Sequence, residues 1–136
     1  MALDFGAKTV GVAVNNGTSC VFPVETIRRD REKTLRATLR RVEELAADRS
    51  VERIVVGLPL NMDRTEGERA LKSREFAERV ARRTGLPVEM WDETLSTVEA
   101  YERLADAGTD VARREEVIDS CAAAVILEAW ISEHDV

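Results

Sequence analysis

The sequence has few of the side chains that usually carry nucleophilic or imidazole chemistry. It has one histidine, His134, near the end of the chain. Its two cysteines, Cys20 and Cys121, are far apart and lack metal-ligand spacing. We interpret Cys121, which falls on an apolar helical face, as a small buried hydrophobe and not half of a disulfide. These absences weigh against a catalytic imidazole, a disulfide and a metal site at the cysteines.

Aromatic residues and long apolar runs are also scarce. Three Phe, one Tyr and two Trp provide no aromatic platform for stacking single-stranded bases. No apolar run is long enough to cross a membrane, and the first residues lack the basic-then-apolar pattern of a signal peptide. At 136 residues, 44% hydrophobic and 34% charged, the chain fits one globular domain over residues 1–136. We expect a cytoplasmic location.

Charge is distributed unevenly along the chain. The net charge of −6 argues at first against a nucleic-acid partner. Residues 28–41 nevertheless carry seven basic and two acidic side chains, whereas residues 92–136 carry three basic and twelve acidic ones. Two interpretations stay open: solvated helix faces, or a basic phosphate-binding surface beside an acidic metal-binding end.

Hydrophobic periodicity predicts an α/β fold. Period-two or β-branched runs predict five strands, and period-3.6 runs predict four helices. The strands are expected at 1–5, 9–14, 19–24, 51–60 and 86–92, and the helices at 35–46, 68–83, 96–107 and 117–131, with loops at 61–67 and 108–114. Hairpins come first and βαβ crossovers follow. This order predicts a mixed five-stranded sheet, antiparallel then parallel, with helices on both faces.

Three carboxylates lie where predicted segments begin or end. Asp4 lies in the first strand, Glu93 follows the last strand, and Asp119 lies near the start of the last helix. Hard divalent cations prefer such oxygen ligands. Each acid also has an ordinary alternative. Asp4 can cap the turn at Gly6, Glu93 competes with Asp92, and Asp119 can be a solvated helix acid.

Four stretches carry a resemblance to a known family. They are Asp4–Val14, Ile54–Asp63, Asp92–Ala100, and Val117–Ser120 followed by alanines. The first resembles the opening hairpin of the ribonuclease H-like superfamily. Together the four most closely resemble the YqgF family of RuvX-like Holliday-junction resolvases and pre-16S ribosomal RNA nucleases. The resemblance covers essentially the whole chain.

The resemblance implies a ribonuclease H-like fold and an acidic triad at Asp4, Glu93 and Asp119. Such a triad would hold Mg²⁺ or Mn²⁺, and two such ions about 4 Å apart can clamp a scissile phosphate. Substrate contacts would come from other positions near the site. These positions are Gly6, Lys8, Asn61, Arg113 and Arg114. We place Arg113 and Arg114 in a loop that closes over nucleic acid, with a solvated pair as the alternative.

The chain departs from the family pattern at several positions. Family members often have threonine at Ala7, a basic or polar residue at Thr9, and aspartate at Asn16. Arginine is usual at Thr94, where its loss removes a bidentate phosphate contact. The triad is intact, so these changes bear on affinity, rate and substrate choice.

We therefore expect a metal-dependent hydrolase, a nuclease that matures the 5′ end of pre-16S ribosomal RNA. The alternative is a Holliday-junction resolvase acting on branched DNA in recombination and repair, for which a homodimer would supply two active sites. A lower alternative is a weakly active or non-catalytic nucleic-acid-binding module. The Asp-Phe-Gly hairpin also resembles the phosphate-binding hairpin of sugar kinases and actin-like ATPases, but the chain is too short for the two domains that those proteins need.

Overall fold

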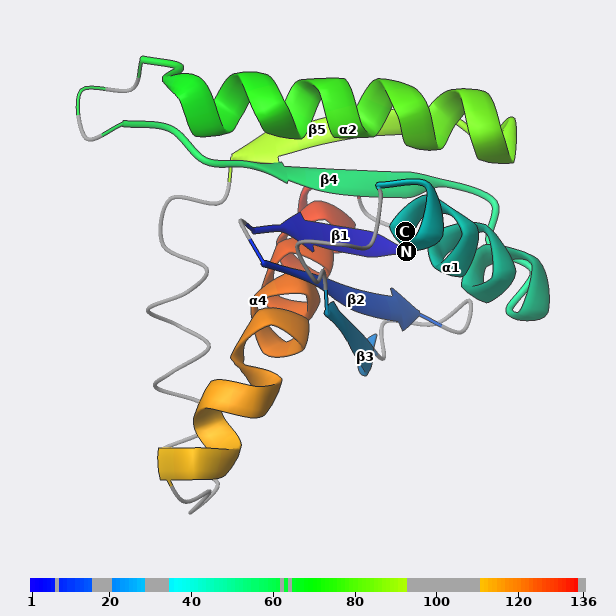
Figure 1. Cartoon of the computed structure of the whole chain (residues 1–136), viewed down its shortest axis with the longest axis horizontal. Coiled ribbons are helices and arrows are strands. Elements are labelled where there is room, and N and C mark those ends of the chain that lie inside the picture. Colours follow the sequence, from blue (N-terminus) through cyan, green and yellow to red (C-terminus); the bar gives the residue numbers. More distant parts are fainter. Residues whose placement is uncertain are drawn as a thin grey trace.

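A mixed sheet with helices on both faces forms the body of the protein (Figure 1). The computed structural model describes residues 1–6, 8–15, 21–28, 35–61, 63, 65–92 and 111–134, with side chains from 122 onward in the last range. Its elements are β1 (Ala2–Phe5), β2 (Thr9–Asn15), β3 (Val21–Arg28), α1 (Leu35–Asp48), β4 (Ile54–Leu58), α2 (Glu68–Thr84), β5 (Val88–Asp92) and α4 (Val111–His134). Within these ranges no helix has the length and apolarity needed to span a membrane.

The five strands follow the order β3-β2-β1-β4-β5. β1 pairs antiparallel with β2, and β2 pairs antiparallel with β3. On its other side β1 pairs parallel with β4, which pairs parallel with β5. The first strand is therefore the centre of the sheet, and the prediction of antiparallel hairpins followed by parallel strands is confirmed.

Strand alternation divides the core into two layers. Leu3, with the inward residues of β2 and β4, packs beneath α1 and α2. Ala2, Ala13 and Val55 face the opposite way and pack against α4. In Figure 1, α4 passes behind β1 and β2, and its N-terminal part continues past the sheet. Successive residues of β1 thus point to different layers, which fixes the face on which each of its side chains lies.

The two helices on the first face form where the sequence has apolar residues at helical spacing. α1 buries Thr38, Leu39, Val42, Leu45 and Ala46. α2 buries Ala70, Ser73, Phe76, Ala77 and Val80. Gly85 ends α2 in the left-handed conformation at φ 71°, and its N–H donates to the Ala81 carbonyl. The helix predicted at 68–83 is therefore confirmed as α2 to within one residue.

The largest errors in the predicted boundaries are at β3 and α4. β3 runs to Arg28 instead of ending at Val24, because an edge strand can present polar side chains to solvent on one face. α4 begins at Val111, so the expected loop does not extend to Arg114. Charged residues are good helix formers when they lie outside a core, which allows a polar first stretch of helix. The helix predicted at 96–107 lies outside the described residues.

Candidate active site at the carboxyl edge of the sheet

Three parallel strands end at one edge of the sheet. Leu3 of β1 pairs with Val56 of β4, and Leu58 at the end of β4 pairs with Asp92 at the end of β5. In Figure 1 the ends of β1, β4 and β5 all lie on the same side. Ligands of such sheets usually bind beyond the carboxyl ends of parallel strands, so this edge is the place to seek a site.

Asp4 lies at this edge on the face that α4 covers. It pairs with Gly11 of β2. Its neighbour Ala2 belongs to the core layer under α4, whereas Leu3 and Phe5 pack toward the α1 and α2 layer. Alternation therefore places Asp4 with Ala2, and the residue is half-buried. A half-buried carboxylate in an otherwise apolar strand needs compensating partners.

β5 carries the chain to the position before Glu93. Trp91 packs against the α4 layer, and Met90 against the opposite layer. Alternation thus places Asp92 on the α1 and α2 face, opposite the face on which Asp4 lies. Glu93 itself lies outside the described residues. The described part of β5 therefore shows no contact that selects Asp92 or Glu93 as the ligand. It does show that Asp92 and Asp4 lie on opposite faces of the sheet.

Asp119 lies within α4, about two turns after the helix begins at Val111. Its position is one turn before Ala123, which is fully buried in the layer that also contains Ala2. Positions 119 and 123 are four residues apart, so the α4 backbone places both on the same side of the helix, with position 119 nearer its N-terminus. The side chain of Asp119 lies outside the described set.

The prediction that Arg113 and Arg114 lie in a loop is wrong. Arg113 and Arg114 lie in the first turn of this helix, not in a loop. Helical backbone fixes their positions relative to Asp119, which a free loop would not do. Their side chains lie outside the described set, so their contact with substrate stays a prediction.

Three other predicted positions surround the ends of β1 and β4. The N–H of Gly6 donates to the Thr9 carbonyl at 2.8 Å, closing the β1–β2 hairpin, and Lys8 is exposed in that turn. Asn61 is exposed after β4, where its Nδ2 donates to Thr65 Oγ1 at 3.0 Å. Gly6 therefore serves the turn. Asn61 makes a hydrogen bond within its own loop.

The described side chains do not by themselves make a metal centre. Among them no group of three or more His, Cys, Asp or Glu residues is close enough to hold an ion. Two of the three expected ligands, Glu93 and Asp119, have side chains outside that set. The one histidine of the sequence, His134, makes a packing contact: its ring stacks on Trp130 with 4.1 Å between centroids.

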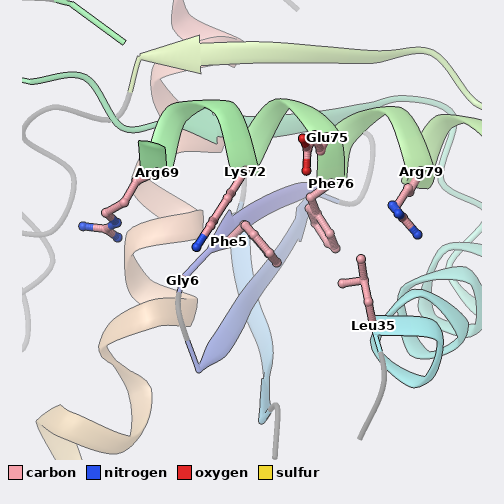
Figure 2. Close-up of a pocket in the computed structure, with 8 residues that line it drawn as sticks. All are labelled: Phe5, Gly6, Leu35, Arg69, Lys72, Glu75, Phe76 and Arg79. Carbon is pink, nitrogen blue, oxygen red and sulfur yellow. The ribbon is translucent and has the colours of Figure 1, made fainter. Parts of the chain in front are cut away.

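A cavity of about 390 Å³ opens on the other face of the same edge. Figure 2 shows it between β1, α2 and the start of α1. Its described lining is Phe5, Gly6, Leu35, Arg69, Lys72, Glu75, Phe76 and Arg79. Sequence reasoning missed it, although a signal existed. Arg69, Lys72, Phe76 and Arg79 are spaced by three or four residues, which places them along one side of a helix.

The arrangement of strands defines the fold class of this protein. With β1 at the centre of a mixed five-stranded sheet, the chain has a ribonuclease H-like α/β fold. RuvC of Thermus thermophilus in complex with a Holliday junction substrate superposes with a TM-score of 0.59 at 18% identity, over 98% of this chain and 94% of RuvC. A second T. thermophilus RuvC structure gives a TM-score of 0.58 at 14% identity.

The family is shown by sequence. The family model described as "RuvX: Holliday junction resolvase" matches residues 1–133, and the chain belongs to this family. A protein of Myxococcus xanthus named "Putative pre-16S rRNA nuclease" is 46% identical over 98% of this chain and 87% of its own length. Relatives with the same name in Agathobacter rectalis and Lachnospira eligens are 46% and 47% identical, each over 96% of this chain. The resemblance noted in the sequence is thereby confirmed.

Proposed function

We propose that this protein is a metal-dependent nuclease that hydrolyses phosphodiester bonds in the 5′-end maturation of pre-16S ribosomal RNA. The observation that carries the proposal is Asp4, a half-buried carboxylate on the α4 face at the carboxyl edge of the sheet. Membership of the RuvX family over residues 1–133 and the shared name of the curated relatives support the reaction and the substrate. We take residues 1–136 to act as a single nuclease domain.

Asp4, Glu93 and Asp119 are the proposed metal ligands. Oxygen donors suit Mg²⁺ or Mn²⁺, and the described frame fits such a group. Asp4 lies on the α4 face, β5 ends one residue before Glu93, and α4 carries position 119 one turn before the buried Ala123. Bound divalent ions would lower the pKa of attacking water and neutralise charge on the phosphate. The role of the chain is to bring carboxylates from three distant positions to one edge.

Charged and polar groups around the edge are proposed to orient the substrate. Lys8 is an exposed point charge at the β1–β2 turn, and Asn61 is exposed at the end of β4. Gly6 keeps that turn tight. Arg113 and Arg114, in the first turn of α4, would contact the phosphate backbone.

A second candidate function is Holliday-junction resolution. The description of the matching family model favours it, because that description is of a Holliday junction resolvase. A four-way junction is symmetric, so resolution would need two active sites, which a homodimer of this chain supplies. The net charge of −6 argues against one copy gripping two duplexes, and we therefore place the RNA substrate first.

The test is cleavage by Asp4→Asn in Mg²⁺ or Mn²⁺, with labelled pre-16S ribosomal RNA and a labelled four-way junction as substrates. Removal of one metal ligand should slow cleavage by about a hundredfold or more. Asp48→Asn is the matched control, because Asp48 is an exposed carboxylate at the end of α1, near the start of β4. It should cleave at the wild-type rate.

Each outcome has a defined meaning. Unchanged cleavage by Asp4→Asn would show that the proposed site is wrong. Cleavage of the junction but not of the RNA precursor would favour the resolvase. Tight RNA binding by the wild type without turnover in either metal would favour a binding module that lacks catalysis.

A further inference from the structure

The cavity under α2 lies next to the candidate active site but on the opposite face of β1. Asp4 and Phe5 are consecutive residues of one strand, so their Cα atoms are about 3.8 Å apart. Asp4 belongs to the α4 face, whereas Phe5 lines the cavity. A chain that passes over the end of β1 can therefore contact the acidic site and the cavity together.

The described walls of the cavity are mainly basic. Arg69, Lys72 and Arg79 contribute positive charge, and Glu75 is the one acidic group among the described lining residues. Figure 2 shows Lys72 and Arg79 extending from α2 on the cavity side, with Arg69 at the start of the helix. Three cations against one carboxylate favour an anionic occupant.

These cations are available for a ligand. Among the described residues neither Arg69 nor Arg79 forms an ion pair. Lys72 pairs with Glu68 at 3.3 Å, but the two side chains are 62% and 83% exposed. Pairs this exposed contribute little, so a phosphate can replace Glu68 at low cost. By contrast, Arg74 on the same helix is held by Glu66 at 2.5 Å.

The floor of the cavity is apolar and aromatic. The Phe5 ring stacks on Phe76 with 4.3 Å between centroids and 11° between planes. Phe76 is only 1% exposed, whereas Phe5 is half-buried, so Phe5 retains ring surface toward the cavity. Leu35 of α1 contributes the opposite apolar wall. The composition predicted no aromatic platform for bases, but packing brings Phe5 onto Phe76 beside the cations of α2. An aromatic surface beside cations is the combination that holds an unpaired base and its phosphate.

We propose that this cavity is a binding subsite for an unpaired nucleotide of the substrate strand, flanking the phosphate that is cleaved. The base would lie against Phe5, and its phosphates would contact Lys72 and Arg79, with Arg69 at the mouth. This inference rests on the proposed function, since it assigns the substrate a single-stranded segment next to the scissile bond. A volume of about 390 Å³ suits one nucleotide and excludes a duplex, whose bases are already paired and stacked.

The test measures binding without cleavage. A labelled single-stranded oligoribonucleotide is titrated with the full chain in EDTA at several salt concentrations, and fluorescence anisotropy gives Kd. Arg79→Gln and Lys72→Gln should each weaken binding about fivefold, and each should reduce the slope of log K against log salt by about 0.7. Arg82→Gln is the matched control. Arg82 lies on the same helix and is exposed, but it does not line the cavity.

A second arm tests the base. Phe5→Leu should weaken binding of the oligoribonucleotide but not of an abasic oligomer of the same length and charge. If Phe5→Leu only disturbed the fold, it would weaken both equally. Equal loss for both oligomers, or equal loss in Arg79→Gln and Arg82→Gln, would overturn the subsite. So would an equal effect of Arg79→Gln on a blunt duplex.

Failure of the subsite is distinguishable from failure of the nuclease site. If pocket variants bind normally while Asp4→Asn abolishes cleavage, the subsite alone is wrong. If Asp4→Asn still cleaves while the pocket variants bind weakly, the cavity binds nucleic acid and the metal site is wrong.

Discussion

Phe76 is the residue that links the core to the cavity. Its side chain is 1% exposed in the layer under α1 and α2, and its ring stacks on Phe5 at the end of β1. The contact joins α2 to the strand that carries Asp4. A core aromatic thus holds one wall of the proposed subsite and the end of the strand that bears the proposed metal ligand.

Phe76→Ala should therefore lower the free energy of unfolding by about 3–5 kcal/mol, because it removes buried ring contacts and leaves a cavity. Leu71→Ala is the control on the same helix. Leu71 is 58% exposed, so its truncation should change the free energy of unfolding by no more than about 0.5 kcal/mol. Urea unfolding followed by circular dichroism measures both. Similar losses for the two variants would contradict the assigned packing of α2.

At the scale of elements, an ion pair joins the edge strand β3 to α1. Arg41 of α1 donates from Nε to Glu25 at 2.9 Å and from Nη2 at 2.7 Å. The Arg41 side-chain hydrogen bonds lower the pKa of Glu25 below its usual range. A carboxyl whose folded-state pKa is lowered contributes stability above its unfolded-state pKa, and this contribution is lost as pH falls through the folded-state value.

We expect Glu25→Gln to be less stable than the wild type at pH 7, and the difference to shrink as the pH falls below the usual range of glutamate. The effect should be modest because the Arg41 and Glu25 side chains are 40% and 31% exposed. Urea midpoints from pH 7 to pH 3 measure it. Glu44→Gln removes the more exposed partner of Arg41, 3.2 Å away, and should change stability less. A difference that does not depend on pH would argue against the pair.

At the scale of the whole molecule, the sheet is protected most at its centre. β1, β2 and β4 have neighbours on both sides and core layers on both faces, while β3 and β5 lie at the edges of the described sheet. Local opening costs most where burial and pairing are greatest. The proposed metal ligand Asp4 therefore lies on one of the well-protected inner strands.

Native-state hydrogen exchange should show the slowest amides in β1 and β4 and faster exchange in β3. The physical reason is that, among the described strands, β3 pairs with β2 alone, and their register shifts between Val12 and Ala13. Residue-resolved exchange by NMR measures this order. Faster exchange in β1 than in β3 would contradict the arrangement of the two core layers.

Much of this architecture is readable from local patterns. Period-two and period-3.6 runs predicted the five strands and the helices α1, α2 and α4, because side-chain burial follows those periods directly. Boundaries were less accurate at β3 and α4, where polar residues such as Glu25 and Arg113 extend an element that local hydrophobicity alone would end. The cavity was not foreseen, because its walls come from β1, α1 and α2, and only packing brings Phe5 to Phe76.

The order of the described elements, the family and the chemical type of the proposed ligands follow from the sequence alone, since these depend on residue identity and spacing. The face on which each side chain lies depends on the packing of the helices on the sheet. It placed Asp4 toward α4 and Phe5 toward α2, because alternation in a strand becomes a choice of face only when helices cover both sides of the sheet. One strand therefore contributes to a proposed metal site on one face and to a proposed nucleotide subsite on the other.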